Sequence, residues 1–315
     1  MISGLRWTVD NYRPFFQTVK MPFDTLLQWF GFVLNSVSPT IFIIFAGLVA
    51  WQVGGRRLAS TILGSLVFLG FIGVWQDSMT TLSIVLTALV VAFALGLPLG
   101  IWAARSERVF MIMRPILDGM QTIPAFVYLV PIVMLFGIGN VPGVIVTVIY
   151  AVPPLIRLTN LGIRQVPEEV VEAMRAFGST ECQLLWKAQL PLALPTIMAG
   201  INQTLMMSLG MVVVASMIAV GGLGQTVLRG IGRLDIGLAT VGGLGIVTLA
   251  IVLDRFSHSL STQKRRPGEI WLQGPVGMIR GVVGLTKRGK RDGRRGDEVT
   301  SNQSQDEFAN KSPAD

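Results

Sequence analysis

Six long stretches without a charged residue limit what this chain can fold into more than any other feature of its sequence. They cover residues 36–53, 58–75, 82–104, 124–156, 195–221 and 236–253. A bilayer core about 30 Å thick is crossed by a helix of roughly 20 apolar residues. Charged residues make up only 14% of the chain, whereas soluble domains contain about 25%. The sequence therefore predicts an all-α membrane protein and not a soluble domain with a buried helical core.

The fourth stretch is too long for one crossing and contains turn residues near its middle. Residues 124–156 include Gly137, Gly139 and Pro142. Gly and Pro at such positions predict a tight hairpin between two helices. Because each of the other five stretches fits one crossing, we expect about seven transmembrane helices.

The distribution of Lys and Arg predicts how these helices are oriented, since short cytoplasmic loops carry an excess of both. One side of the predicted bundle carries Arg56, Arg57, Arg105, Arg108, Arg114, Arg157, Arg164, Arg175, Lys187 and the basic run at 264–266. The other side carries Arg229 and Arg233, and the basic residues of the N-terminal segment also count against the assignment. The balance predicts a multi-pass protein of the inner (plasma) membrane with its N-terminus outside and its C-terminus in the cytoplasm.

Composition divides the chain into three parts. Residues 1–35 mix aromatic side chains with Arg and Lys, which is typical of a segment lying in the membrane interface. Residues 36–257 form the predicted transmembrane domain, with one long loop at 158–194. Residues 258–315 are rich in basic and small polar residues, so we expect a disordered cytoplasmic tail. A basic tail beside a membrane helix favours contact with membrane lipids, and no nucleic acid partner is expected.

The loop at 158–194 is patterned as two short helices. Pro167, followed by Glu168 and Glu169, predicts a helix start, because proline suits the first turn and acids stabilise the helix dipole there. Gly178 is expected to end this helix and Ser179 to cap a second one. The second helix is then expected to end at Pro191 and Pro195, before the next crossing. The prediction is a helix–turn–helix on the cytoplasmic side, with an apolar ridge formed by Val170, Val171, Met174 and Phe177.

Within this loop the sequence resembles the Glu-Ala-Ala loop of the permeases of ABC importers. The matching residues are Glu172, Ala173, Met174, Gly178, Gln189, Leu190 and Pro191. Met174 departs mildly from the usual alanine. The runs at 121–131, 199–205 and 215–224 are similar to the permeases of glycine betaine/L-proline (ProU-type) importers, within the binding-protein-dependent transport system inner membrane component family.

The resemblance implies an ABC importer type I permease fold, in which the loop at 158–194 couples the membrane domain to a separate ATPase subunit. It places Glu172, Ala173, Gly178, Leu190 and Pro191 in that coupling loop. A substrate-binding protein is the second implied partner. A permease homodimer is expected as well, because one loop serves one ATPase and ATP sites of this kind form between two ATPases.

The residues needed for catalysis are missing from the sequence. It has no Gly-x-x-x-x-Gly-Lys-Ser/Thr motif for ATP phosphates. One histidine, His258, and one cysteine, Cys182, exclude the usual sets of zinc ligands. We therefore expect a transport subunit with no catalytic residue, cofactor or metal, and assign ATP hydrolysis to the partner.

Four polar residues in the sixth predicted crossing have two interpretations. Asn202, Gln203, Ser208 and Ser216 either form interhelical hydrogen bonds or line the translocation path. The transported solute is expected from the resemblance to be a betaine-type osmoprotectant. Choline, carnitine or an amino acid such as histidine are the alternatives. A secondary transporter is less favoured, because the predicted crossings contain no Asp or Glu for ion coupling.

Overall fold

The computed structural model describes residues 2–261, with side chains described from residue 15 to residue 260, and every regular element in this range is helical. The helices are α1 (Ile2–Ser36), α2 (Pro39–Phe71), α3 (Trp75–Arg105), α4 (Glu107–Thr122), η1 (Ala125–Tyr128), α5 (Leu129–Phe136), α6 (Asn140–Arg164), α7 (Glu168–Ala176), α8 (Glu181–Leu184), the π-turn η2 (Leu185–Gln189), α9 (Leu190–Ala215), η3 (Ser216–Ile218), α10 (Leu223–Gly232) and α11 (Ile236–Ser261). The expected tail lies almost entirely outside the described residues.

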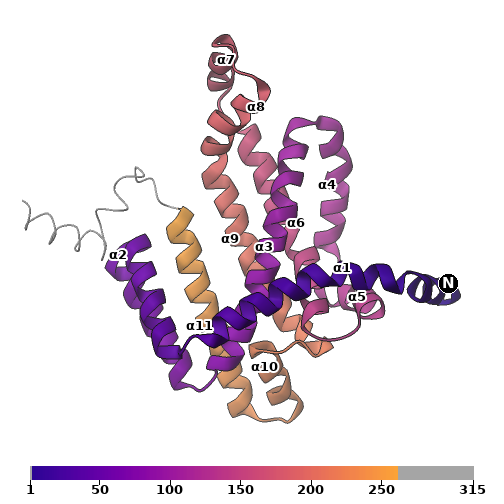
Figure 1. Cartoon of the computed structure of the whole chain (residues 1–315), viewed down its shortest axis with the longest axis vertical. Helices are drawn as coiled ribbons and strands as arrows, with labels where there is room; N and C mark the ends of the chain where they lie inside the picture. The colour runs from indigo at the N-terminus through magenta and orange to yellow at the C-terminus, as the bar shows by residue number, and fades with distance from the viewer. Residues whose placement is uncertain (1, 262–315) are drawn as a thin grey trace, which may run out of the picture.

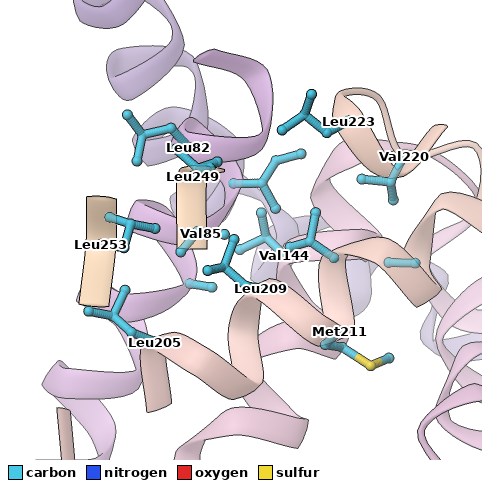
Figure 2. Close-up of a cluster of buried hydrophobic side chains, with 14 of the residues drawn as sticks. Leu82, Val85, Val144, Leu205, Leu209, Met211, Val220, Leu223, Leu249 and Leu253 are labelled. Atoms are coloured by element: carbon cyan, nitrogen blue, oxygen red, sulfur yellow. The ribbon is translucent and has the colours of Figure 1, made fainter. Parts of the chain in front are cut away.

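The centre of the molecule is a bundle of α3, α6 and α9, with α6 the most enclosed of the long helices (Figure 1). Small residues allow the close approach: a Cβ at Gly100 would lie 2.6 Å from Thr159, and one at Gly96 3.0 Å from Leu155. Figure 2 shows the apolar core, in which side chains from α3, α6, α9 and α11 meet. Helix α1 packs across α3, α5 and α6 and runs at a steep angle to the bundle.

Within residues 2–261, five helical segments are long and apolar enough to cross a membrane, and a sixth forms if α4 is joined to η1 and α5. They are α2, α3, α6, the run Glu181–Ile218 and α11. This count is lower than the seven crossings expected from the sequence. Two local features of the backbone, in α2 and around α5, account for the differences.

Helix α2 contains the first two predicted crossings, which are divided at Gly55. The backbone there is not helical, with φ 78° and ψ −171°. A Cβ at Gly47 would lie 2.6 Å from the side chain of Leu63, whereas these residues would be roughly 24 Å apart in a straight helix. The chain therefore folds back on itself at Gly55, immediately before the basic pair that predicted this loop.

The predicted fourth crossing is not a complete helix. Helix α5 has only eight residues, which span about 12 Å. The preceding residues, predicted as a loop, instead form α4, and the α4–α5 pair is bent by 105°. The expected hairpin after α5 is confirmed, with positive φ at Gly137 and Gly139. Helix α4 was not predicted, because its charged residues interrupt the apolar stretches from which the crossings were predicted.

Candidate functional site: the α7–α8 elbow and the polar face of α9

The predicted helix–turn–helix is formed by α7 and α8. This elbow projects beyond one end of the α3–α6–α9 bundle (Figure 1). Helix α7 begins directly after Pro167, with Glu168 and Glu169 in its first turn and Arg175 in its last. This charge order stabilises a short helix, because acids lie at the positive end of its dipole and a base at the negative end. The predicted start of the helix is confirmed.

Gly178 ends α7 as the sequence predicts. The amide of Gly178 donates to the carbonyl of Arg175 at 2.9 Å, and the amide of Ser179 donates to that of Met174 at 3.0 Å. This pair of bonds is the Schellman arrangement, which needs a left-handed residue. Gly178 has φ +75°, and a Cβ built on it would meet nothing within 4 Å. The glycine is therefore required by backbone conformation and not by crowding within this chain.

The second helix differs from the expectation at both ends. Its N-cap is Thr180 and not Ser179: the Thr180 hydroxyl accepts from the amide of Gln183, and the Gln183 side chain accepts from the amide of Thr180. Ser179 is already used in closing α7. Pairing with a glutamine three residues later makes threonine the better cap.

The expected end of this helix at Pro191 and Pro195 is wrong. The helical run continues from Glu181 to Ile218, with the π-turn η2 just before Pro191 and with Pro195 inside α9. Proline lacks an amide donor and crowds the carbonyl four residues earlier, so it disrupts ordinary α-helical bonding. A wider π-turn beside Pro191 relieves this conflict without ending the helix. The elbow is thereby joined to α9 through continuous helix.

The elbow is anchored on its inner side and exposed on its outer side. The Arg105 guanidinium donates to the carbonyl of Glu181 at 2.7 Å, which fixes α8 to the end of α3. An ion pair of 3.1 Å joins Arg175 to Glu181 across the turn. Phe177 is 89% exposed and Trp186 65%.

The residues assigned to the coupling loop lie along this elbow and its continuation. Glu172, Ala173 and Gly178 are exposed at the tip, whereas Leu190 is half-buried and Pro191 exposed where η2 passes into α9. Of the predicted apolar ridge, Val170, Val171 and Met174 are half-buried and Phe177 is exposed. The elbow thus exposes Ala173 and Phe177 beside charged side chains such as Glu172, and its projection beyond the bundle suits it to fitting into a groove on another protein.

The four polar residues of α9 do not converge on one point. The Asn202 amide donates to the Asp254 carboxylate at 3.5 Å and accepts from the Ser257 hydroxyl at 2.6 Å, so it joins α9 to α11. Ser208 and Ser216 are buried, and each donates to a carbonyl of its own helical run. Gln203 is exposed. The interhelical role is therefore present at Asn202, while the translocation path remains a prediction for all four.

Reasoning from the sequence missed polar contacts at the end opposite the elbow. The Thr226 hydroxyl donates to the Asp77 carboxylate, and the amide of Leu223 donates to the Thr81 hydroxyl at 2.9 Å. These bonds hold α10 against α3. The only feature of the sequence that could have indicated these contacts is Asp77, a charged residue shortly before an apolar stretch. The chain turns at the glycines that follow α9, with φ +99° at Gly222.

A model of the family described as "Binding-protein-dependent transport system inner membrane component" matches residues 96–266. The glycine betaine/proline betaine transport system permease protein ProW of Escherichia coli (strain K12) is 58% identical over 279 residues, which are 88% of this chain and 79% of ProW. The glycine betaine/carnitine transport permease protein GbuB of Listeria monocytogenes serotype 1/2a is 45% identical, over 84% of this chain and 94% of GbuB.

A solved structure has a similar fold. An inward-facing form of the MetNI methionine ABC transporter matches with a TM-score of 0.55 and 22% sequence identity, over 61% of this chain and 96% of that chain. This agreement supports the all-helical fold expected for a type I permease. The matching region of the family model contains the elbow, α9 and most of the central bundle.

Proposed function

This chain belongs to the family of binding-protein-dependent transport system inner membrane components, and we propose that it is the permease through which an ATP-driven importer moves glycine betaine, proline betaine and similar compatible solutes. It is a transport subunit, and ATP hydrolysis belongs to a separate subunit. The relatives named for glycine betaine support the choice of solute.

The observation that carries this proposal is the exposed elbow on a continuous helix. Helix α8 passes through η2 into α9 without a break, so a displacement of the elbow would be transmitted along the helix into the bundle. Residues Glu172, Ala173 and Gly178 would contact the ATPase at the tip. Leu190 and Pro191 would set the angle at which the elbow meets α9.

The remaining partners follow from how such an importer must work. Two copies of this chain would present two elbows to two ATPases, whose ATP sites form between them. A substrate-binding protein would deliver the solute at the end that carries α10, on the outer side of the membrane. Residues 1–35 would lie at the membrane interface and residues 258–315 near the lipids of the cytoplasmic leaflet. The N-terminus would be outside.

The proposal is tested by uptake of radiolabelled glycine betaine at high osmolarity. The full chain is expressed with its ATPase and binding protein in a strain that lacks betaine uptake. We expect uptake that requires all three proteins and is inhibited by unlabelled proline betaine. Choline, carnitine and histidine serve as competing solutes.

One result would overturn the proposed permease role, and another would overturn only the proposed solute. Uptake by the permease without the ATPase would indicate a secondary transporter. Uptake of choline, carnitine or histidine in place of glycine betaine would agree with the permease role but show that the proposed solute is wrong.

A further inference from the structure

Helices α4 and α6 line an open, charged cleft of about 420 Å³, a size that suits small ligands. It is lined by Phe110, Arg114, Leu117, Asp118, Arg157, Asn160 and Leu161. Arg157 lies roughly 10 Å along α6 from the end that leads to the elbow. Charged side chains on membrane helices face a cavity or a protein partner and not lipid chains. The cleft is therefore a candidate for the inner part of a polar path through the bundle.

One ion pair joins the two walls of the cleft. The Arg157 guanidinium lies 2.5 Å from the Asp118 carboxylate, and the side chains are 38% and 52% exposed. Both partners are thus within reach of a small molecule in the cleft. Arg114 lines the same space, and within residues 15–260 it has no ion-pair partner.

A buried amide adds an unsatisfied donor to this cleft. Asn160 is 5% exposed, and within the described part of the chain its Nδ2 has no hydrogen-bond partner. A buried donor without an acceptor is unfavourable unless a ligand or water supplies one. Asn160 lies one helical turn beyond Arg157 on α6, so the two can act on the same group.

We propose that this cleft binds a zwitterionic solute by exchange of partners in the Arg157–Asp118 ion pair, a proposal that rests on the function proposed above. The solute's carboxylate takes the place of Asp118 beside Arg157 and Asn160, and its cationic group takes the place of Arg157 beside Asp118. After the exchange, Arg157, Asp118 and both charged groups of the solute each have an opposite partner. A solute with a cation alone, such as choline, would leave the Arg157 guanidinium unpaired in a partly desolvated site, which is costly.

The structure offers a matched control for this ion pair. Arg164 and Glu107 form a second pair, 2.6 Å long, between the same two helices but outside the cleft lining. The variant Glu107→Gln removes a carboxylate from α4 just as Asp118→Asn does. Arg164 keeps its bond to the carbonyl of Ala103 and its place over the Phe110 ring.

The test uses the complete importer in proteoliposomes and measures radiolabelled glycine betaine moved per ATP hydrolysed. Asp118→Asn and Asn160→Leu are each expected to lower this ratio about tenfold, the order expected for losing a hydrogen bond with a charged partner. Stimulation of ATPase activity by the loaded binding protein is expected to remain. Asp118→Glu should restore most of the ratio, and Glu107→Gln should stay near wild type.

The outcomes separate the two proposals. If the wild-type importer moves no glycine betaine, both fail. If it does, and Asp118→Asn and Asn160→Leu both match Glu107→Gln, only the cleft proposal fails. A defect that changes with the anionic lipid content of the vesicles would also overturn it, because the groups would then hold a lipid phosphate. If the Asp118→Asn protein does not insert into the membrane, the Asn160→Leu protein still tests the cleft proposal.

Discussion

At the scale of single residues, Gly178 shows how one backbone conformation positions a surface. Its amide and that of Ser179 close α7, and its positive φ turns the chain toward α8. Open space surrounds the position of a Cβ. A side chain there would cost the isolated chain only the strain of a left-handed residue, about 1 kcal/mol. Any larger effect must come from a partner.

We therefore predict that Gly178→Asp abolishes solute uptake while the protein inserts at a normal level. The new carboxylate would be desolvated where the ATPase approaches, which costs more than the backbone strain. The measurements are uptake, membrane abundance and ATPase activity of the same preparations. ATP hydrolysis is expected to persist but to lose its response to the loaded binding protein.

Gly178→Asn is the matched control for this variant. Asparagine has nearly the shape of aspartate, carries no charge and tolerates the left-handed conformation. It should keep a substantial part of the uptake. Normal uptake by Gly178→Asp would show that the elbow is not the coupling element, and equal loss in both variants would assign the effect to bulk and not charge.

At the scale of helices, α9 is defined by the turn at its start and by hydrogen bonds from its middle. The π-turn η2 carries the helix past Pro191, so the elbow and the membrane span form one rod. Further along, Asn202 binds Asp254 and Ser257 of α11. These bonds fix the position of α9 along α11. Apolar contacts alone are not directional and would allow the two helices to slide along each other.

The α9–α11 bonds lead to a prediction about stability. Asn202→Ala removes the partner of Asp254 and Ser257 and should destabilise the protein by about 1 kcal/mol. This corresponds to a fall of roughly 2–4 °C in the thermal midpoint, for a domain of this size. The measurement is thermal unfolding of the purified protein in detergent.

Gln203→Ala is the neighbouring control, because Gln203 is exposed. Its thermal midpoint should match that of the wild type. If Gln203 lines the translocation path, uptake would nevertheless fall in this variant. Equal midpoints for Asn202→Ala and the wild type would mean that the bonds to α11 contribute nothing to stability.

At the scale of the whole molecule, contacts between distant residues define two opposite ends. Glu181 binds Arg105 at the elbow end, and a Cβ at Gly54 would contact Ser259 near the end of α11. At the other end, the amide of Gly221 donates to the Asn140 side chain at 2.8 Å. The loops that carry most of the Lys and Arg therefore lie opposite α10.

This arrangement predicts the result of topology reporters fused at five positions. Fusions after Gly54, Glu107 and Thr180 should report the cytoplasm, and fusions after Asn140 and Gln225 the outer side. Alkaline phosphatase and fluorescent protein fusions, active on opposite sides, give the two readouts. An outer location for Thr180 would remove the elbow from reach of any ATPase and contradict the proposed function.

Several features were predictable from the sequence because they depend on residues that are close together along the chain. Apolar stretches long enough to cross a bilayer require helices, since backbone groups in lipid must be bonded within the segment. The start of α7 at Pro167, its end at Gly178 and the break between α5 and α6 follow from the conformational limits of proline and glycine. The resemblance to known permeases likewise rested on short runs of residues.

Other features depended on which helices pack together, and a sequence pattern does not carry that information. Helix α4 was missed because its charges suggested a loop, whereas in the fold its two acidic residues, Glu107 and Asp118, meet Arg164 and Arg157 of α6. Asp118 lies 39 positions before its partner Arg157. Pro191 ends a helix in isolation, but here the π-turn maintains it within the packed bundle. The sequence by itself determined the fold class and the elbow, because local sterics and the cost of burying charge act over a few residues. Only the tertiary structure decided the cleft and the continuity of α9, because these arise from contacts between distant helices.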